Sequence, residues 1–89
     1  MFAKRLWLIL REGREERAVP KAWLDQFFMR NFTGYGAFDE TLPVGDGELE
    51  AGSSVEVEEV RRRFEEWLRG RKMISPGCRL EVISDRNSR

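Results

Sequence analysis

The alternation of apolar and charged residues predicts a central β-strand near the start of the chain. Residues 5–11 are bulky and mostly apolar, with an arginine at each end, which is typical of a strand inside a sheet. Because successive side chains of a strand point to opposite faces, one face carries Leu6, Leu8 and Leu10. The other face carries Arg5, Trp7, Ile9 and Arg11. The leucine face needs helices to cover it, and no obvious segment of the chain covers the tryptophan face.

Two later segments have the spacing of amphipathic helices. The first is predicted to begin at Val19-Pro20 and to end at Thr33-Gly34. Its apolar stripe consists of Trp23, Leu24, Phe27, Phe28 and Phe32. The second is predicted from about Ser54 to Arg69, with Ser53 and Glu56 at capping-box spacing and Gly70 ending the helix. Its apolar stripe consists of Val57, Val60, Phe64, Trp67 and Leu68. Both stripes can cover the leucine face.

The remaining segments predict further strands separated by turns. Strands are expected at Tyr35–Thr41, at Glu48–Glu50 with Leu49 pointing inward, and at Cys78–Ser84. Residues 12–17 are predicted to be a loop and residues 42–47 a turn, with Asp46-Gly47 as a hairpin signal. The order βαββαβ predicts an α+β fold of the ferredoxin-like type, an antiparallel sheet with two helices on one face. We expect a single domain over residues 1–89 with a frayed polar tail at 85–89. The expected core is Leu8, Leu10, Phe28, Phe64, Leu68, Leu80 and Val82.

Composition narrows the classes of function. The chain has 16 acidic and 16 basic residues and a net charge of zero, which argues against a general nucleic-acid coat protein. Histidine is absent, so the commonest general base and metal ligand is missing. Cys78 is the single cysteine, and we interpret it as a half-buried structural thiol of a cytoplasmic protein. No apolar run is long enough to predict a membrane helix. We therefore expect that the protein is not an enzyme and that it has no cofactor and no metal site.

The tryptophan face is the first candidate binding surface. It comprises Arg5, Trp7, Ile9 and, from the last strand, Ile83. A basic and aromatic sheet face can stack single-stranded RNA or DNA, as RNA-recognition modules do, but the neighbouring strand offers Glu48 and Glu50, which repel phosphate. The favoured alternative pairs Arg5 or Arg11 with these glutamates across the strands. The tryptophan then packs against a second copy, forming a homodimer, or against another partner.

A run of acidic residues is the second candidate. Between Asn31 and Val60 the chain has no lysine or arginine. Asp39, Glu40, Asp46, Glu48 and Glu50 could form an acidic surface for a basic partner. The structural alternative applies to the acidic residues that follow, Glu56, Glu58 and Glu59. They would serve the helix dipole and, with Glu65, the ion pairs Glu58–Arg62, Glu59–Arg63 and Glu65–Arg69.

These patterns favour a function in binding rather than catalysis. The segment Asp46-Gly47-Glu48 with Glu50 could offer oxygen ligands to a divalent cation, but it lacks the regular spacing of an EF-hand loop, and a plain turn is the better interpretation. The leading hypothesis is a small protein-interaction domain, dimeric, that binds or inhibits a basic macromolecule. Small phage-encoded inhibitors, anti-CRISPR proteins among them, often work in this way. The alternative is a single-stranded nucleic-acid-binding module that uses the Trp7 face.

Overall fold

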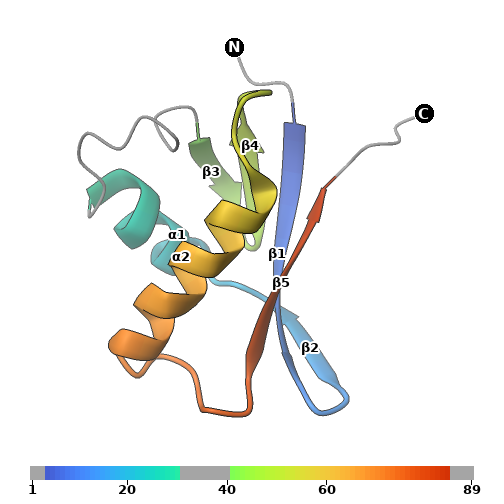
Figure 1. Cartoon of the computed structure of the whole chain (residues 1–89), viewed down its shortest axis with the longest axis vertical. Coiled ribbons are helices and arrows are strands. Elements are labelled where there is room, and N and C mark those ends of the chain that lie inside the picture. Colours follow the sequence, from blue (N-terminus) through green and yellow to red (C-terminus); the bar gives the residue numbers. More distant parts are fainter. Residues whose placement is uncertain (1–3, 31–40, 85–89) are drawn as a thin grey trace.

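The computed structural model describes residues 4–30 and 41–84 and shows an α+β fold (Figure 1). Five strands form one antiparallel sheet: β1 (Lys4–Glu12), β2 (Glu15–Ala18), β3 (Thr41–Gly45), β4 (Glu48–Ala51) and β5 (Arg79–Ser84). The helices are α1 (Lys21–Asp25), which continues as a π-helical turn η1 (Gln26–Arg30), and α2 (Val57–Gly70). The predicted α+β class with an antiparallel sheet is confirmed. In the described part of the chain, no helix has the length and apolar character needed to cross a membrane.

Strand β1 organises the sheet because every other strand except β3 pairs with it. Strand β5 pairs with one edge of β1, from Leu6 to Arg11. The other edge is divided, since β4 pairs with residues 4–7 and β2 pairs with residues 9–12. Strand β3 pairs with β4 at the end of the sheet. The finer ferredoxin-like prediction is not confirmed, because the sheet has a fifth strand that divides an edge of β1.

The predicted loop at residues 12–17 is wrong, because these residues turn back as strand β2. Glu12 lies opposite Glu15, so the hairpin turn contains two residues. Gly13, the first of them, has a φ of 62°, which this position of a tight hairpin favours. All four residues of β2 are exposed, so pairing with β1 rather than apolar burial holds the strand.

The turn of the second hairpin begins later and is shorter than the sequence predicts. Strand β3 covers most of the predicted turn at 42–47, and Pro43 is tolerated there because β3 lies at the sheet edge. The turn itself is Asp46-Gly47, as predicted. The short strand with a fully buried Leu49 is also confirmed. The predicted end of the first helix and residues 35–40 of the predicted second strand lie outside the described residues.

Both ends of α2 differ from the prediction. The helix starts at Val57 without a side-chain cap, so the predicted capping box at Ser53 is wrong. Gly70 lies in the last turn rather than after it. The left-handed position belongs to Lys72, with a φ of 59°, whose N–H bonds Arg69 O at 3.0 Å while Met73 N–H bonds Leu68 O at 2.9 Å. This pattern is a Schellman motif.

Two of the three predicted ion pairs on α2 form. Glu59 pairs with Arg63 and Glu65 pairs with Arg69. Glu58 pairs with Arg61 instead of Arg62, one residue closer along the same face of the helix. Such i,i+3 and i,i+4 pairs contribute a few tenths of a kcal/mol each to the helix, so they support α2 but do not decide where it packs.

The helices cover the leucine face of the sheet. One core joins the inward residues of the strands to the apolar stripes of the helices: Leu6, Leu8, Leu10, Leu49 and Leu80 with Leu24, Phe28, Val60, Phe64 and Leu68. The Phe64 ring lies 5.0 Å from Phe27 and 5.6 Å from Phe28, measured between centroids. The predicted core residues are buried except Val82, which is partly buried because β5 is an edge strand.

Glu65 joins α2 to the outer edge of β5. Its Oε2 accepts the Leu80 N–H at 3.0 Å, and its carboxylate pairs with Arg61 and Arg69. Partial burial raises the pKa of Glu65. The Leu80 N–H and the two arginines lower this pKa by more than burial raises it, so the net pKa lies below its ordinary value. Arg69 also donates to the Cys78 carbonyl at 2.7 Å. Two α2 side chains thus satisfy backbone groups on this sheet edge.

Replacing Phe64 with alanine should test the packing of α2. The variant should lose about 3–5 kcal/mol of unfolding free energy, because a fully buried aromatic ring leaves a cavity. Chemical denaturation measures the loss. Met29→Ala removes an exposed side chain instead and should change stability by less than about 0.5 kcal/mol. An unchanged unfolding curve for Phe64→Ala would show that α2 is not packed as described.

Replacing Glu65 with glutamine should reveal a pH-dependent contribution to stability. The carboxylate has a lowered folded pKa, so its contribution is present above the ordinary value of 4.5 and is lost as the pH falls through the folded pKa. The stability advantage of the wild type over Glu65→Gln, measured by denaturation at several pH values, should therefore shrink in acid. If the advantage stays constant, hydrogen bonding rather than charge explains the role of Glu65.

Candidate functional site

The face of the sheet opposite the helices brings together the two surfaces that the sequence predicts separately. Trp7 lies opposite Ile83 of β5 on one side and opposite Glu48 of β4 on the other. The Trp7 Nε1–H donates to Glu48 Oε2 at 3.3 Å, which orients the indole. The predicted tryptophan face and part of the predicted acidic run therefore form one surface, which we call the open face.

Two charge clusters occupy the ends of the open face. Arg5 Nη2 lies 2.9 Å from Glu50, and Arg5 Nη1 lies 3.9 Å from Glu48, as the sequence predicts. Arg11 pairs with Glu81 and Glu16 instead of the predicted β4 glutamates. In each cluster, one arginine lies between two carboxylates.

The pairing of Arg11 also shifts proton affinities in the second cluster. Arg11 Nε lies 2.8 Å from Glu81, and Nη2 lies 3.1 Å from the other oxygen. This hydrogen bonding raises the pKa of Arg11 and lowers the pKa of Glu81. Both groups stay charged at neutral pH, and Arg79, which lies opposite Arg11, also lowers the pKa of Glu81.

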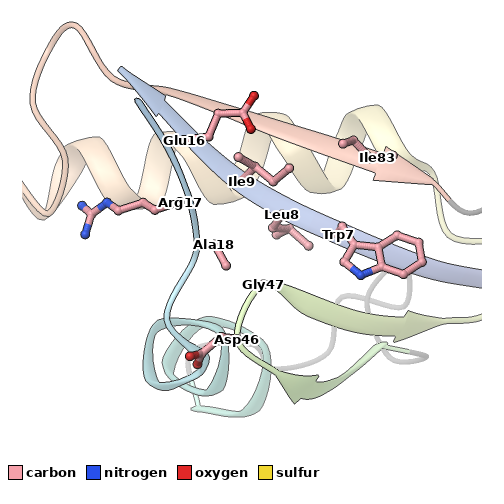
Figure 2. Close-up of a pocket in the computed structure, with 9 residues that line it drawn as sticks. All are labelled: Trp7, Leu8, Ile9, Glu16, Arg17, Ala18, Asp46, Gly47 and Ile83. Carbon is pink, nitrogen blue, oxygen red and sulfur yellow. The ribbon is translucent and has the colours of Figure 1, made fainter. Parts of the chain in front are cut away.

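An apolar hollow of about 370 Å³ lies beside Trp7 on the open face, with Glu16 of the second cluster in its lining (Figure 2). Its lining is mainly apolar and comes from β1, β2, β5 and the β3–β4 turn: Trp7, Leu8, Ile9, Ala18, Gly47 and Ile83. Three charged residues, Glu16, Arg17 and Asp46, complete the lining. Figure 2 shows the Arg17 side chain extending away from Trp7 and Ile83. The charge that borders the hollow is therefore mainly negative.

The hollow exists because three backbone segments meet at Leu8. Leu8 N–H donates to Gly47 O at 2.7 Å, Gly47 N–H to Val19 O at 2.6 Å, and Val19 N–H to Leu8 O at 3.1 Å. A Cβ on Gly47 would lie 2.8 Å from the Ala18 Cβ and 2.9 Å from Leu8 O. The close approach therefore requires glycine at this position, and the small side chain of Ala18 leaves the surface recessed.

The structure gives each described residue of the predicted acidic surface a specific place. Asp46 Oδ1 accepts the Lys21 N–H at 2.9 Å at the start of α1. Glu48 contacts Trp7, and Glu50 pairs with Arg5. Asp39 and Glu40 lie outside the described residues. Only part of the predicted acidic surface can therefore be placed, and that part borders the Trp7 face.

The described residues offer no group of three or more histidine, cysteine, aspartate or glutamate side chains arranged to hold a metal ion. Asp46, Glu48 and Glu50 each have another partner in the chain. Cys78 is buried, and burial raises the pKa of its thiol. A raised pKa favours the thiol over the reactive thiolate. The prediction of a half-buried thiol underestimates its burial.

Sequence reasoning missed the contribution of β2 to the site. Glu16, Arg17 and Ala18 line the hollow, but their polar segment suggested a loop. The signal that could have found them is Gly13-Arg14, a glycine-containing pair of the kind that forms two-residue hairpin turns. A strand on each side of this turn would have placed Ala18 beside Ile9.

Comparison with models of protein families finds no match, and comparisons with curated proteins and with solved structures find none either. Function therefore has to be inferred from the surface itself.

Replacing Gly47 with alanine should test the close approach beneath the hollow. Gly47 and Gly13 both have positive φ, at 70° and 62°, but a Cβ on Gly13 would meet nothing within 4 Å. Gly13→Ala should therefore lose about 1–2 kcal/mol from backbone strain alone. Gly47→Ala should lose about 1–3 kcal/mol more, because overpacking adds to the strain. Equal losses, measured by denaturation, would show that the backbones are less crowded at Leu8.

Proposed function

We propose that this protein is a non-catalytic protein-interaction domain that binds the basic segment of a partner protein on its open face. The observation that carries the proposal is the apolar hollow beside Trp7 with carboxylates at its border. The same surface would suit a small inhibitor that occupies a basic groove of another protein.

The apolar content of the open face supports a binding role. Trp7 and Ile9 are only partly buried, and Ile83 is 49% exposed. These residues are neighbours across β1 and β5 and line the same hollow. Tryptophan is enriched among the residues that dominate binding energy in protein interfaces. A partner that covers Trp7 and Ile83 would remove this apolar surface from water.

The charge of the open face favours a basic partner. Its strands carry Arg5, Arg11 and Arg79 against Glu16, Glu48, Glu50 and Glu81, and the lining of the hollow adds Asp46 and Arg17, with the Arg17 side chain extending away from Trp7. Complementary charge steers association and suppresses unsuitable partners. A segment with lysine or arginine beside an apolar residue matches both the charge and the hollow.

Two other occupants fit less well. Single-stranded nucleic acid would need cations for its phosphates, but Arg5 and Arg11 each already contact two carboxylates. A second copy of the chain, placed face to face, would bring two acidic borders together. Homodimer formation and nucleic-acid binding are therefore treated as alternative outcomes of the experiment that follows.

Selection from a displayed random peptide library should identify the recognised sequence. Immobilised wild-type protein should enrich peptides that combine lysine or arginine with an apolar residue. Ile83→Lys should weaken their binding by about tenfold or more, because it adds a positive charge beside Trp7 and removes an apolar contact. Met29→Lys is the matched control, since Met29 is 54% exposed, Ile83 is 49% exposed, and Met29 lies on η1 outside the hollow. Fluorescence anisotropy measures both affinities.

The binding should also weaken as salt rises, because charges separated by more than the screening length of about 8 Å at physiological salt interact weakly. Failure to enrich any peptide, or equal losses in the two lysine variants, would contradict the proposal. Salt-sensitive binding of single-stranded RNA that Ile83→Lys leaves intact would also contradict it. A dimer seen by light scattering and abolished by Ile83→Lys would assign the open face to a second copy.

A further inference from the structure

The hollow combines an apolar wall with a charged border, because apolar and charged residues line the same cavity. Trp7, Ile9 and Ile83 supply the wall, and Ala18 and Gly47 leave the space open. Glu16 and Asp46 supply the carboxylates. A purely apolar ligand would use the wall and leave these carboxylates unmatched. A ligand with an apolar body and a cationic end would use both parts.

Asp46 differs from the other carboxylates of the open face. Glu16 and Glu81 pair with Arg11, and Glu48 and Glu50 pair with Arg5. Within residues 4–30 and 41–84, no ion pair neutralises Asp46, and the Lys21 ammonium pairs with Asp25 instead. Asp46 Oδ1 is nevertheless held at 2.9 Å by the Lys21 N–H. Asp46 is thus a positioned carboxylate without a cationic side-chain partner in the described structure.

Trp7 adds a second group suited to a cation. Tryptophan offers the strongest ring face for cation–π contacts, and the bond from Trp7 Nε1–H to Glu48 fixes the orientation of this ring. Lysine and arginine place their aliphatic stems along apolar surfaces while the charged end reaches a polar site. The Trp7 ring can therefore accept the aliphatic stem of such a side chain and add a favourable contact with its positive charge, while Asp46 offers the carboxylate.

We infer that the hollow is a receptor for one basic side chain, the lysine or arginine of the partner segment, and this inference rests on the proposed function. The stem packs against Trp7, Ile9 and Ile83, and the cationic group lies beside Asp46. Glu16 is already paired with Arg11, so it contributes to the negative potential of the hollow without being the principal partner. Occupation of the hollow makes this protein specific for partner segments that carry a basic residue.

Short capped peptides test this inference by nuclear magnetic resonance. The probes are glycine tripeptides with lysine, arginine or norleucine in the middle, where norleucine keeps the stem and lacks the charge. The indole N–H signal of Trp7 should shift with the lysine and arginine peptides. The signals of Trp23 and Trp67 are internal controls, because neither residue lines the hollow. The lysine peptide should bind about fivefold more tightly than the norleucine peptide, which corresponds to about 1 kcal/mol for a partly exposed charge pair.

Three variants separate the charge from the shape of the hollow. Asp46→Asn keeps an oxygen for the Lys21 N–H but removes the charge, so the preference for lysine over norleucine should disappear. Glu50→Gln is the matched control, because Glu50 lies on the open face outside the hollow, and it should keep the preference. Ala18→Leu should fill the hollow and abolish the Trp7 shift for both peptides, while its exposed position lets the fold persist.

Equal affinities for lysine and norleucine would overturn the inference, as would an Asp46→Asn variant that keeps the preference. A Trp7 signal that moves with protein concentration in the absence of peptide would also overturn it, because a second copy would then occupy the hollow. If the tripeptides fail but library-selected peptides still depend on Ile83, the inference fails and the proposed function stands. If the library also yields no binder, the proposed function fails.

Discussion

The structure depends on a ring of three backbone hydrogen bonds around Leu8. Strand β1 shares one edge between β2 and β4, and the two strands can meet there only if the polar groups at their junction are satisfied. Leu8, Val19 and Gly47 satisfy one another, with each residue donating to the next. Leu8 and Val19 are fully buried, so an unpaired group at this junction would be costly. This requirement selects glycine at position 47 and produces the hollow on the open face.

The two faces of β1 use their side chains in different ways. The leucine face is sealed by the helices in one core, and its apolar burial is the main source of stability. The open face alternates apolar residues with arginines that are held between glutamates. Such half-exposed ion pairs contribute little to stability. Their larger effect is to neutralise Arg5 and Arg11, so that the face, with Arg79 counted, carries more carboxylates than arginines. In the proposed function this charge favours a basic partner.

The sequence predicts the parts of the fold that depend on apolar periodicity. The alternation from Leu6 to Leu10 and the spacing of Val60, Phe64 and Leu68 correctly place the sheet, α2 and most of the core. Strand β2 was not predicted, because Glu15-Glu16-Arg17 contains no apolar residue and the strand is held only by its pairing with β1. The prediction ends α2 at Gly70, but Lys72 has the left-handed conformation. Met73 follows it and packs on the core, which favours a helix end at this position.

The candidate site shows a similar division. Trp7, Ile9 and Ile83 could be assigned to one face from alternation alone, and the charge run pointed to Asp46, Glu48 and Glu50. The hollow could not be predicted from the sequence. It arises because β2 and β4 pair with the same edge of β1, which brings Ala18 close to Gly47.

The proposed recognition and the stability of the fold are coupled, because consecutive residues of β1 serve them. Leu8 is buried in the core, while its neighbours Trp7 and Ile9 form the wall of the hollow. A shift of one residue in strand register would exchange the two faces, so the core that fixes the register also fixes the wall. Asp46 is tied to α1 through the Lys21 N–H, which links the charged border to the helical layer. The hollow is therefore organised by the fold itself, and the proposed ligand would have less ordering entropy to overcome than on a loop.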